Sequence, residues 1–132
     1  FEAIDGPIRR HLAWLGEGDD LLRRRADGGY RFNGVWSVRL RPHGFHADHV
    51  HPRGWLSSAC YIALPDAVHQ GREGWIKFGQ PGVPTAPSLE AEHFVKPEPG
   101  MLVLFPSYMW HGTVPFTTDE ARMSLAFAVV PK

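Results

Sequence analysis

The sequence contains a single cysteine and carries no net charge, and each of these features excludes some classes of protein. Cys60 alone cannot form an internal disulfide, and its place in an apolar stretch predicts a small buried side chain. The 14 basic and 14 acidic residues balance, so the chain lacks the electrostatic field that attracts nucleic acid or an anionic membrane. We therefore expect neither of these partners.

Long apolar runs are also missing. No stretch reaches the roughly 18 apolar residues of a membrane span, and the start of the chain lacks the charged-then-apolar order of a signal peptide. We expect a soluble, cytoplasmic protein. The chain starts at Phe1 within a predicted helix, which suggests that it was cut from a longer polypeptide. With 132 residues, 43% of them hydrophobic, it can bury one core, so we predict a single domain over residues 1–132.

Residues 1–30 carry helical patterns. Apolar residues recur at helical spacing over residues 2–15, and Pro7 could start or restart this amphipathic helix. A second short helical segment is predicted around residues 19–25, where Asp20 can cap it and the Leu21-Leu22 pair can dock.

Residues 31–132 are predicted to form a β core. Short segments rich in β-branched and aromatic residues alternate there with glycine, proline and polar clusters. The predicted strands are 35–40, 55–64, 74–78, 101–105 and 123–130. Many short strands separated by turns indicate a sandwich or barrel. The proline-containing stretch 80–92 is predicted to be an extended loop over the barrel mouth.

Half of the eight histidines are gathered in one short segment around His49. If that segment is a regular strand, His49 and His51 share one face, whereas His46 and Asp48 share the other. Two pairs of ligands therefore compete for a metal. A non-haem iron site commonly takes two such ligands and a third from a distant strand. His111, which follows a predicted strand end and a tight turn, is the natural third ligand.

A charged residue opens the last predicted strand. Arg122 shares one strand face with Ser124 and two alanines, and a guanidinium buried there would need an anionic partner. The distal carboxylate of a dicarboxylate cosubstrate could accept both prongs of the guanidinium, with the Ser124 hydroxyl as an added donor. Alternatively, Arg122 pairs with Glu120 or Asp119 at the strand edge.

Four motifs follow one another between Trp36 and Pro131. They are His49-x-His51-Pro52, Leu56-Ser57-Ser58-Ala59-Cys60-Tyr61, Phe105-Pro106-Ser107 with His111, and Arg122-x-Ser124. In this order they resemble the iron(II)- and 2-oxoglutarate-dependent oxygenase family. The resemblance implies a double-stranded β-helix, the cupin-like jelly roll. It also implies that His49 and His111 bind iron(II), that Arg122 anchors the cosubstrate 2-oxoglutarate, and that Tyr61 donates a hydrogen bond to the same carboxylate.

The first motif departs from the wider superfamily, which has His-x-Asp or His-x-Glu where this chain has His49-x-His51. The only local His-x-Asp begins at His46 and ends at Asp48. We favour His49 and His51, because Pro52 ends the predicted strand directly after them, as in the family pattern.

The leading hypothesis is an iron(II)- and 2-oxoglutarate-dependent dioxygenase that hydroxylates an organic substrate, either a small molecule or a protein. Trp55 and Trp110 lie next to the proposed ligands and could form a dry rim around the substrate or pack in the core. One rival is a three-His cupin-type dioxygenase or isomerase without 2-oxoglutarate, in which Arg122 would hold the carboxylate of the substrate itself. Another is a non-enzymatic jelly-roll module that binds a ligand.

Overall fold

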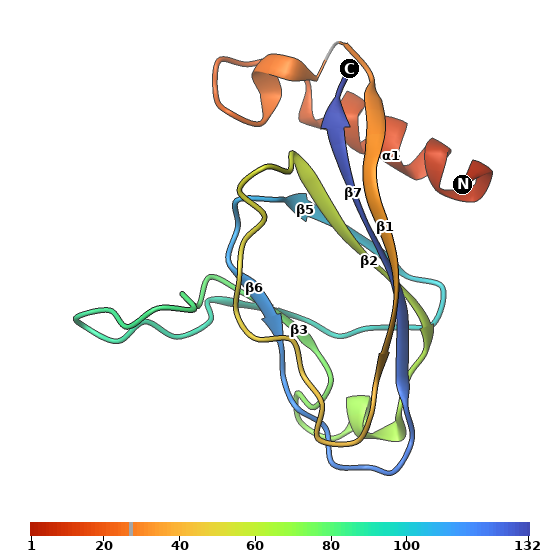
Figure 1. Cartoon of the computed structure of the whole chain (residues 1–132), viewed down its shortest axis with the longest axis vertical. Helices are drawn as coiled ribbons and strands as arrows, with labels where there is room; N and C mark the ends of the chain where they lie inside the picture. Colours follow the sequence, from red (N-terminus) through yellow and green to blue (C-terminus); the bar gives the residue numbers. More distant parts are fainter. Residues whose placement is uncertain (27) are drawn as a thin grey trace.

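The computed structural model describes residues 1–26 and 28–132, which fold into a mainly β structure (Figure 1). Its elements in chain order are α1 (Glu2–Leu15), η1 (Arg23–Arg25), β1 (Tyr30–Leu40), β2 (Leu56–Ala63), η2 (Asp66–His69), β3 (Ile76–Phe78), β4 (His93–Val95), β5 (Leu102–Pro106), β6 (His111–Thr113) and β7 (Arg122–Pro131). Among these residues, no helix has the length and apolar character that crossing a membrane requires.

The strands form two antiparallel sheets. The larger has the order β1-β7-β2-β5 and the smaller the order β4-β3-β6. An isolated bridge between His49 and His111 adds a short segment beyond β6. The smaller sheet lies across from the larger one in Figure 1. This arrangement is the jelly roll predicted from the sequence.

Helix α1 packs on the outer face of the larger sheet. Its residues Ile8 and Leu12 are buried in one core cluster with Leu56 of β2 and with Phe127 and Val129 of β7. The spacing of four between Ile8 and Leu12 places both side chains on the face that meets the sheet. The helix therefore has the predicted bounds, and it runs through Pro7 without restarting there.

The second predicted helix is shorter than expected. It is reduced to the single turn η1, which Asp20 caps by accepting a hydrogen bond of 3.0 Å from the backbone N–H of Leu22. Leu22 docks into the core below α1, whereas Leu21 is exposed.

All five predicted strands are present, but residues 80–92 lie elsewhere than expected. The chain is extended there, yet it projects outward from the smaller sheet in Figure 1 and lines no part of the cavity between the sheets. At its base, Gly82 lies so close to the backbone carbonyl of Asp48 that a β-carbon would not fit. The prediction that this loop covers the barrel mouth was therefore wrong.

Strand β7 connects the fold to the site. It lies between β1 and β2, and its side chains alternate as the sequence predicts. Phe127 and Val129 pack with α1, while Arg122 and Ser124, together with two alanines, line the cavity on the inner face. The central strand of the larger sheet thus delivers a buried arginine to the space between the sheets.

Candidate active site

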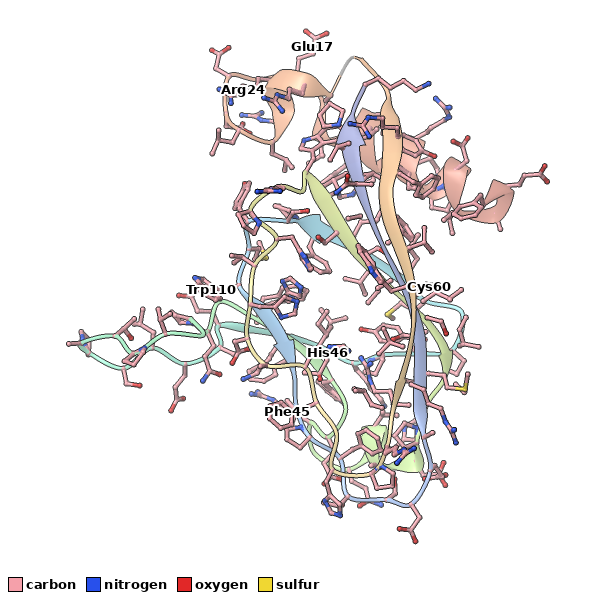
Figure 2. The ribbon with its side chains drawn as sticks, in the orientation of Figure 1. Glu17, Arg24, Phe45, His46, Cys60 and Trp110 are labelled. Carbon is pink, nitrogen blue, oxygen red and sulfur yellow. The ribbon has the colours of Figure 1, made fainter. Side chains whose placement is uncertain are left out.

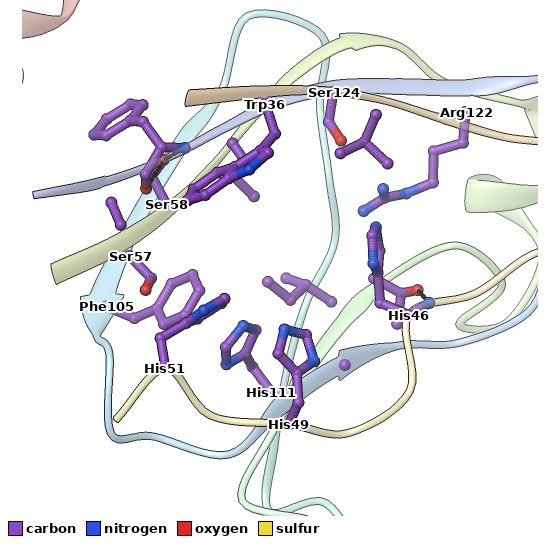
Figure 3. Close-up of a pocket in the computed structure, with 18 residues that line it drawn as sticks. Trp36, His46, His49, His51, Ser57, Ser58, Phe105, His111, Arg122 and Ser124 are labelled. Carbon is purple, nitrogen blue, oxygen red and sulfur yellow. Dashed lines mark hydrogen bonds between the residues drawn. The ribbon is translucent and has the colours of Figure 1, made fainter. Parts of the chain in front are cut away.

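A cavity of about 190 Å³ lies between the two sheets, and Figure 3 shows its lining. Strands of both sheets contribute side chains to it, as does the irregular segment that carries His46, His49 and His51. Its lining residues include no aspartate or glutamate. Arg122 is therefore the one side chain with a permanent charge in the lining, and the cavity favours an anion.

Three histidines converge in the middle of this cavity. One ring nitrogen from each of His49, His51 and His111 lies within 4.8 Å of the other two. The ring centroids are 4.3 Å apart for His49 and His111, 4.9 Å for His49 and His51, and 5.2 Å for His51 and His111. The structure therefore brings together the three histidines that the sequence singled out, and it places their nitrogens close enough to share one ion.

Backbone hydrogen bonds hold these residues together. His49 and His111 exchange backbone N–H to carbonyl bonds of 2.9 and 3.0 Å. The backbone N–H of His51 donates to the carbonyl of Ser107, at 2.8 Å, in the turn that leads into β6. That turn is closed by the Met109 N–H, which donates to the Pro106 carbonyl at 3.0 Å. The predicted tight turn before His111 is therefore present.

The ring orientations of two of these histidines are also preset. Nδ1 of His111 lies 2.9 Å from the carbonyl of Met109, and Nδ1 of His49 lies 2.6 Å from that of Ala47. Because a carbonyl can only accept, each Nδ1 carries the proton, which leaves each Nε2 with a free lone pair. Such outer bonds commonly orient histidines that bind a metal.

Burial favours the neutral form of His51 and His111. It lowers the pKa of His111 to about 4, with smaller contributions from the neighbouring histidines, and it lowers the pKa of His51 as well. Neutral imidazole is the form that binds metal. Three converging imidazole nitrogens could hold a first-row divalent metal such as iron(II), to which they would supply neutral ligands.

Asp48 is turned away from the histidines. Its carboxylate accepts a hydrogen bond of 2.9 Å from Nζ of Lys77, and both side chains are largely buried. Lys77 also donates to Oε1 of Gln80, at 2.7 Å. The competing ligand pair of His46 and Asp48 is thereby separated. His46 nevertheless points into the cavity, contrary to the expectation for a regular strand, because residues 41–48 do not form one.

Arg122 is buried at one end of the cavity with a relative exposure of 2%. Its Nε donates to the carbonyl of Gly74 at 3.1 Å, and no ion pair involves it in the described part of the chain. Glu120 instead accepts a hydrogen bond from the backbone N–H of Asp66. The alternative in which Glu120 or Asp119 neutralises Arg122 was therefore wrong.

Two polar side chains accompany the guanidinium. Ser124 lines the cavity beside it, and the Arg122 guanidinium carbon lies 5.1 Å from the centroid of the Tyr61 ring. The Tyr61 hydroxyl is buried and has no hydrogen-bond partner among the described residues. Burial raises the pKa of Tyr61 while Arg122 opposes this effect, and burial lowers the pKa of Arg122. The buried cation at this end of the cavity therefore lies near a tyrosine that is not part of the cavity lining and whose hydroxyl has no partner among the described residues.

The two tryptophans proposed as a rim lie elsewhere. Trp55 is buried below α1, where its Nε1 donates to the carbonyl of Leu22 at 2.8 Å. Trp110 lies outside the cavity, near the projecting loop (Figure 2). Trp36 of β1 lines the cavity instead and is 48% exposed. Its ring covers Gly34, where a β-carbon would come within 2.5 Å of it. Because side chains alternate between the two faces of β1, the sequence pattern could have identified Trp36 as a cavity residue.

Comparisons with known proteins agree with this geometry. Residues 34–128 match the sequence model of the family described as "Putative 2OG-Fe(II) oxygenase". A comparison with curated proteins found no match.

Three solved structures share the fold. An oxidoreductase of the 2OG-Fe(II) oxygenase family from Burkholderia pseudomallei is 15% identical over 78% of this chain, with a TM-score of 0.60. A prolyl-4-hydroxylase from Pseudomonas putida is 20% identical over 99%, with a TM-score of 0.56. A viral collagen prolyl hydroxylase from Paramecium Bursaria Chlorella virus-1, in complex with 2OG, is 16% identical over 100%, with a TM-score of 0.59. The chain spans 46%, 63% and 74% of these proteins, respectively.

Proposed function

We propose that this chain, which belongs to the 2OG-Fe(II) oxygenase family, is an iron(II)- and 2-oxoglutarate-dependent dioxygenase that hydroxylates an organic substrate. In this proposal His49, His51 and His111 hold the metal, and Arg122 anchors the cosubstrate. One observation carries it. A buried arginine without an acidic partner shares a cavity with three converging histidines, so the cavity offers both a metal site and an anion site.

Iron and 2-oxoglutarate together supply the activation of dioxygen, and the residues of the chain supply placement. Three neutral imidazoles leave the two positive charges of iron(II) uncompensated, and a 2-oxoglutarate dianion would balance them. The distal carboxylate of that dianion can accept two parallel bonds from Arg122. The hydroxyls of Ser124 and Tyr61 are added donors to it, and the bond would give Tyr61 the partner that it lacks.

The opposite end of the cavity would receive the substrate. In Figure 3 Phe105 and Ser57 lie beyond His51 at the end of the cavity away from Arg122, and Trp36 lies across the cavity from the histidines. The Ser57 hydroxyl is already bonded to that of Ser107 at 2.8 Å, so it has little left to offer a ligand. An apolar wall without a free charge favours an uncharged carbon of the substrate, because burying a charge there would cost several kcal/mol.

The direct test is an anaerobic titration with iron(II), with and without 2-oxoglutarate, followed by visible absorption. We expect a weak charge-transfer band only when both are present. Binding of iron without that band would favour a three-His cupin-type enzyme that uses no 2-oxoglutarate. Absence of iron binding would favour the non-enzymatic module.

The role of Arg122 is tested by Arg122→Met, which keeps much of the side-chain volume and leaves no buried charge. We expect 2-oxoglutarate affinity to fall by about 1.5 to 3 kcal/mol or more, the usual value of a hydrogen bond to a charged group, while iron binding persists. Arg122→Lys should recover only part of the loss, because an ammonium cannot offer two parallel donors. Calorimetry under nitrogen on folded, iron-loaded samples measures both. Equal affinity in wild type and Arg122→Met would contradict the proposed role.

A further inference from the structure

The ring of His46 occupies the space between the histidine triad and Arg122. Figure 2 shows it between the two sheets, and Figure 3 shows it directly beside the Arg122 guanidinium. Two hydrogen bonds to one residue of β6 fix its backbone. The His46 N–H donates to Oγ1 of Thr113 at 2.8 Å, and the Thr113 N–H donates to the His46 carbonyl at 3.0 Å. The ring therefore faces the cavity from an anchored position.

His46 does not join the group of metal-binding histidines. The nitrogens that lie within 4.8 Å of one another belong to His49, His51 and His111 alone among the described residues. A fourth ligand at this position is therefore not favoured, and the ring needs another explanation.

The ring also lacks a partner within the chain. Among the described residues no hydrogen bond or ion pair involves its nitrogens. Burial and then the charge of Arg122 lower the pKa of His46, so the imidazole is neutral near neutral pH and carries one N–H. Two side chains with free donors thus stand together, and no acceptor from the described chain lies between them. A small anion with at least two acceptor oxygens would satisfy both.

We infer that His46 is a further cosubstrate-binding residue, which donates its ring N–H to the distal carboxylate of 2-oxoglutarate beside Arg122. This inference rests on the proposed function. The irregular segment that contains both histidines would then have two roles. It would hold the metal through His49 and the cosubstrate through His46.

A comparison of two ligands isolates this contact. 2-Oxoglutarate and 2-oxopentanoate have the same chain length and the same metal-binding keto acid group, but only the former has a distal carboxylate. We expect His46→Phe, which keeps a ring without an N–H, to raise the dissociation constant of 2-oxoglutarate about tenfold or more. The dissociation constant of 2-oxopentanoate should be unchanged. His46→Gln should recover part of the affinity, because its amide retains a donor.

The measurement is anaerobic calorimetry on iron-loaded protein, with His43→Asn as the matched control. His43 lies in the same segment, is exposed and lines no part of the cavity, and asparagine tolerates its positive φ of 67°. We expect this variant to bind both ligands as the wild type does.

The remaining outcomes overturn the inference in distinguishable ways. An equal loss of both ligands in His46→Phe would show that His46 shapes the fold or the metal site. If Arg122→Met loses 2-oxoglutarate affinity and His46→Phe does not, only the role of His46 is refuted. If iron-loaded wild type does not bind 2-oxoglutarate, the proposed function fails and the inference fails with it.

Discussion

Acidification of the metal-free protein should lower its free energy of unfolding, because His111 is buried in its neutral form. Its imidazole is 7% exposed, and its pKa falls from an ordinary value of 6.5 to about 4. As the pH decreases, the unfolded state takes up this proton before the folded state does. The free energy of unfolding is therefore highest above pH 6.5 and decreases between about pH 6.5 and pH 4. The two pKa values imply a total loss of about 3 kcal/mol, of which about 2 kcal/mol is lost by about pH 5.

The assay is urea denaturation in the presence of a chelator, at about pH 7.5 and about pH 5, for the wild type and for His111→Gln. Glutamine does not titrate, so the variant should lose about 2 kcal/mol less stability between these two conditions. Titrating groups that lie far from His111 contribute alike to both proteins and cancel in the comparison. The same loss in both proteins would refute the view that His111 is held neutral by burial.

Two substitutions test how the smaller sheet positions the site. Lys77→Met leaves the buried carboxylate of Asp48 unpaired and should lower the free energy of unfolding by about 3 to 5 kcal/mol. Adding Asp48→Leu should restore most of this stability. An unchanged urea midpoint in Lys77→Met would contradict the prediction. Gly112→Ala places a β-carbon against Oδ1 of Asp48 and within 2.9 Å of the His46 carbonyl, so the segment that carries the proposed ligands His49 and His51 must move. We expect iron affinity in titration to fall by about tenfold or more, with no change in Gly28→Ala, where the nearest atom is 3.6 Å away; equal affinities in both variants would count against it.

The sequence predicts the elements whose patterns are long enough to repeat. Helix α1 repeats its apolar positions over three turns, and β7 alternates over residues 122–129, so both were found with nearly their true bounds. Strands β4 and β6 have three residues each, too few for a period to appear, and both were missed. Strand β3 is as short, and it was predicted from its composition and the turn residues around it, not from a period. Only the pairing of β4 and β6 with β3 makes them strands, and that pairing joins residues distant in the sequence.

In the site, too, features set by neighbouring residues were predicted, and features set by residues distant in the sequence were not. The spacing of His49 and His51 predicts their common direction, and the turn before His111 predicts its approach. The direction of His46 was wrong, because the parity argument assumed a regular strand where the chain is irregular. The partner of Asp48 could not be predicted locally either, since Lys77 follows it by 29 residues and reaches it across the smaller sheet.

The pairing of Asp48 with Lys77 also explains how a His-x-His motif can serve this site. The ion pair, together with the bridge between His49 and His111, holds the Asp48 carboxylate away from the histidines and leaves their side chains in the cavity. With no carboxylate at the metal, iron(II) would keep both of its charges, and Arg122 would add a third in the same cavity. The described chain places no acid there to offset them, so the proposed dianionic cosubstrate would neutralise two of these three positive charges in addition to supplying its chemistry.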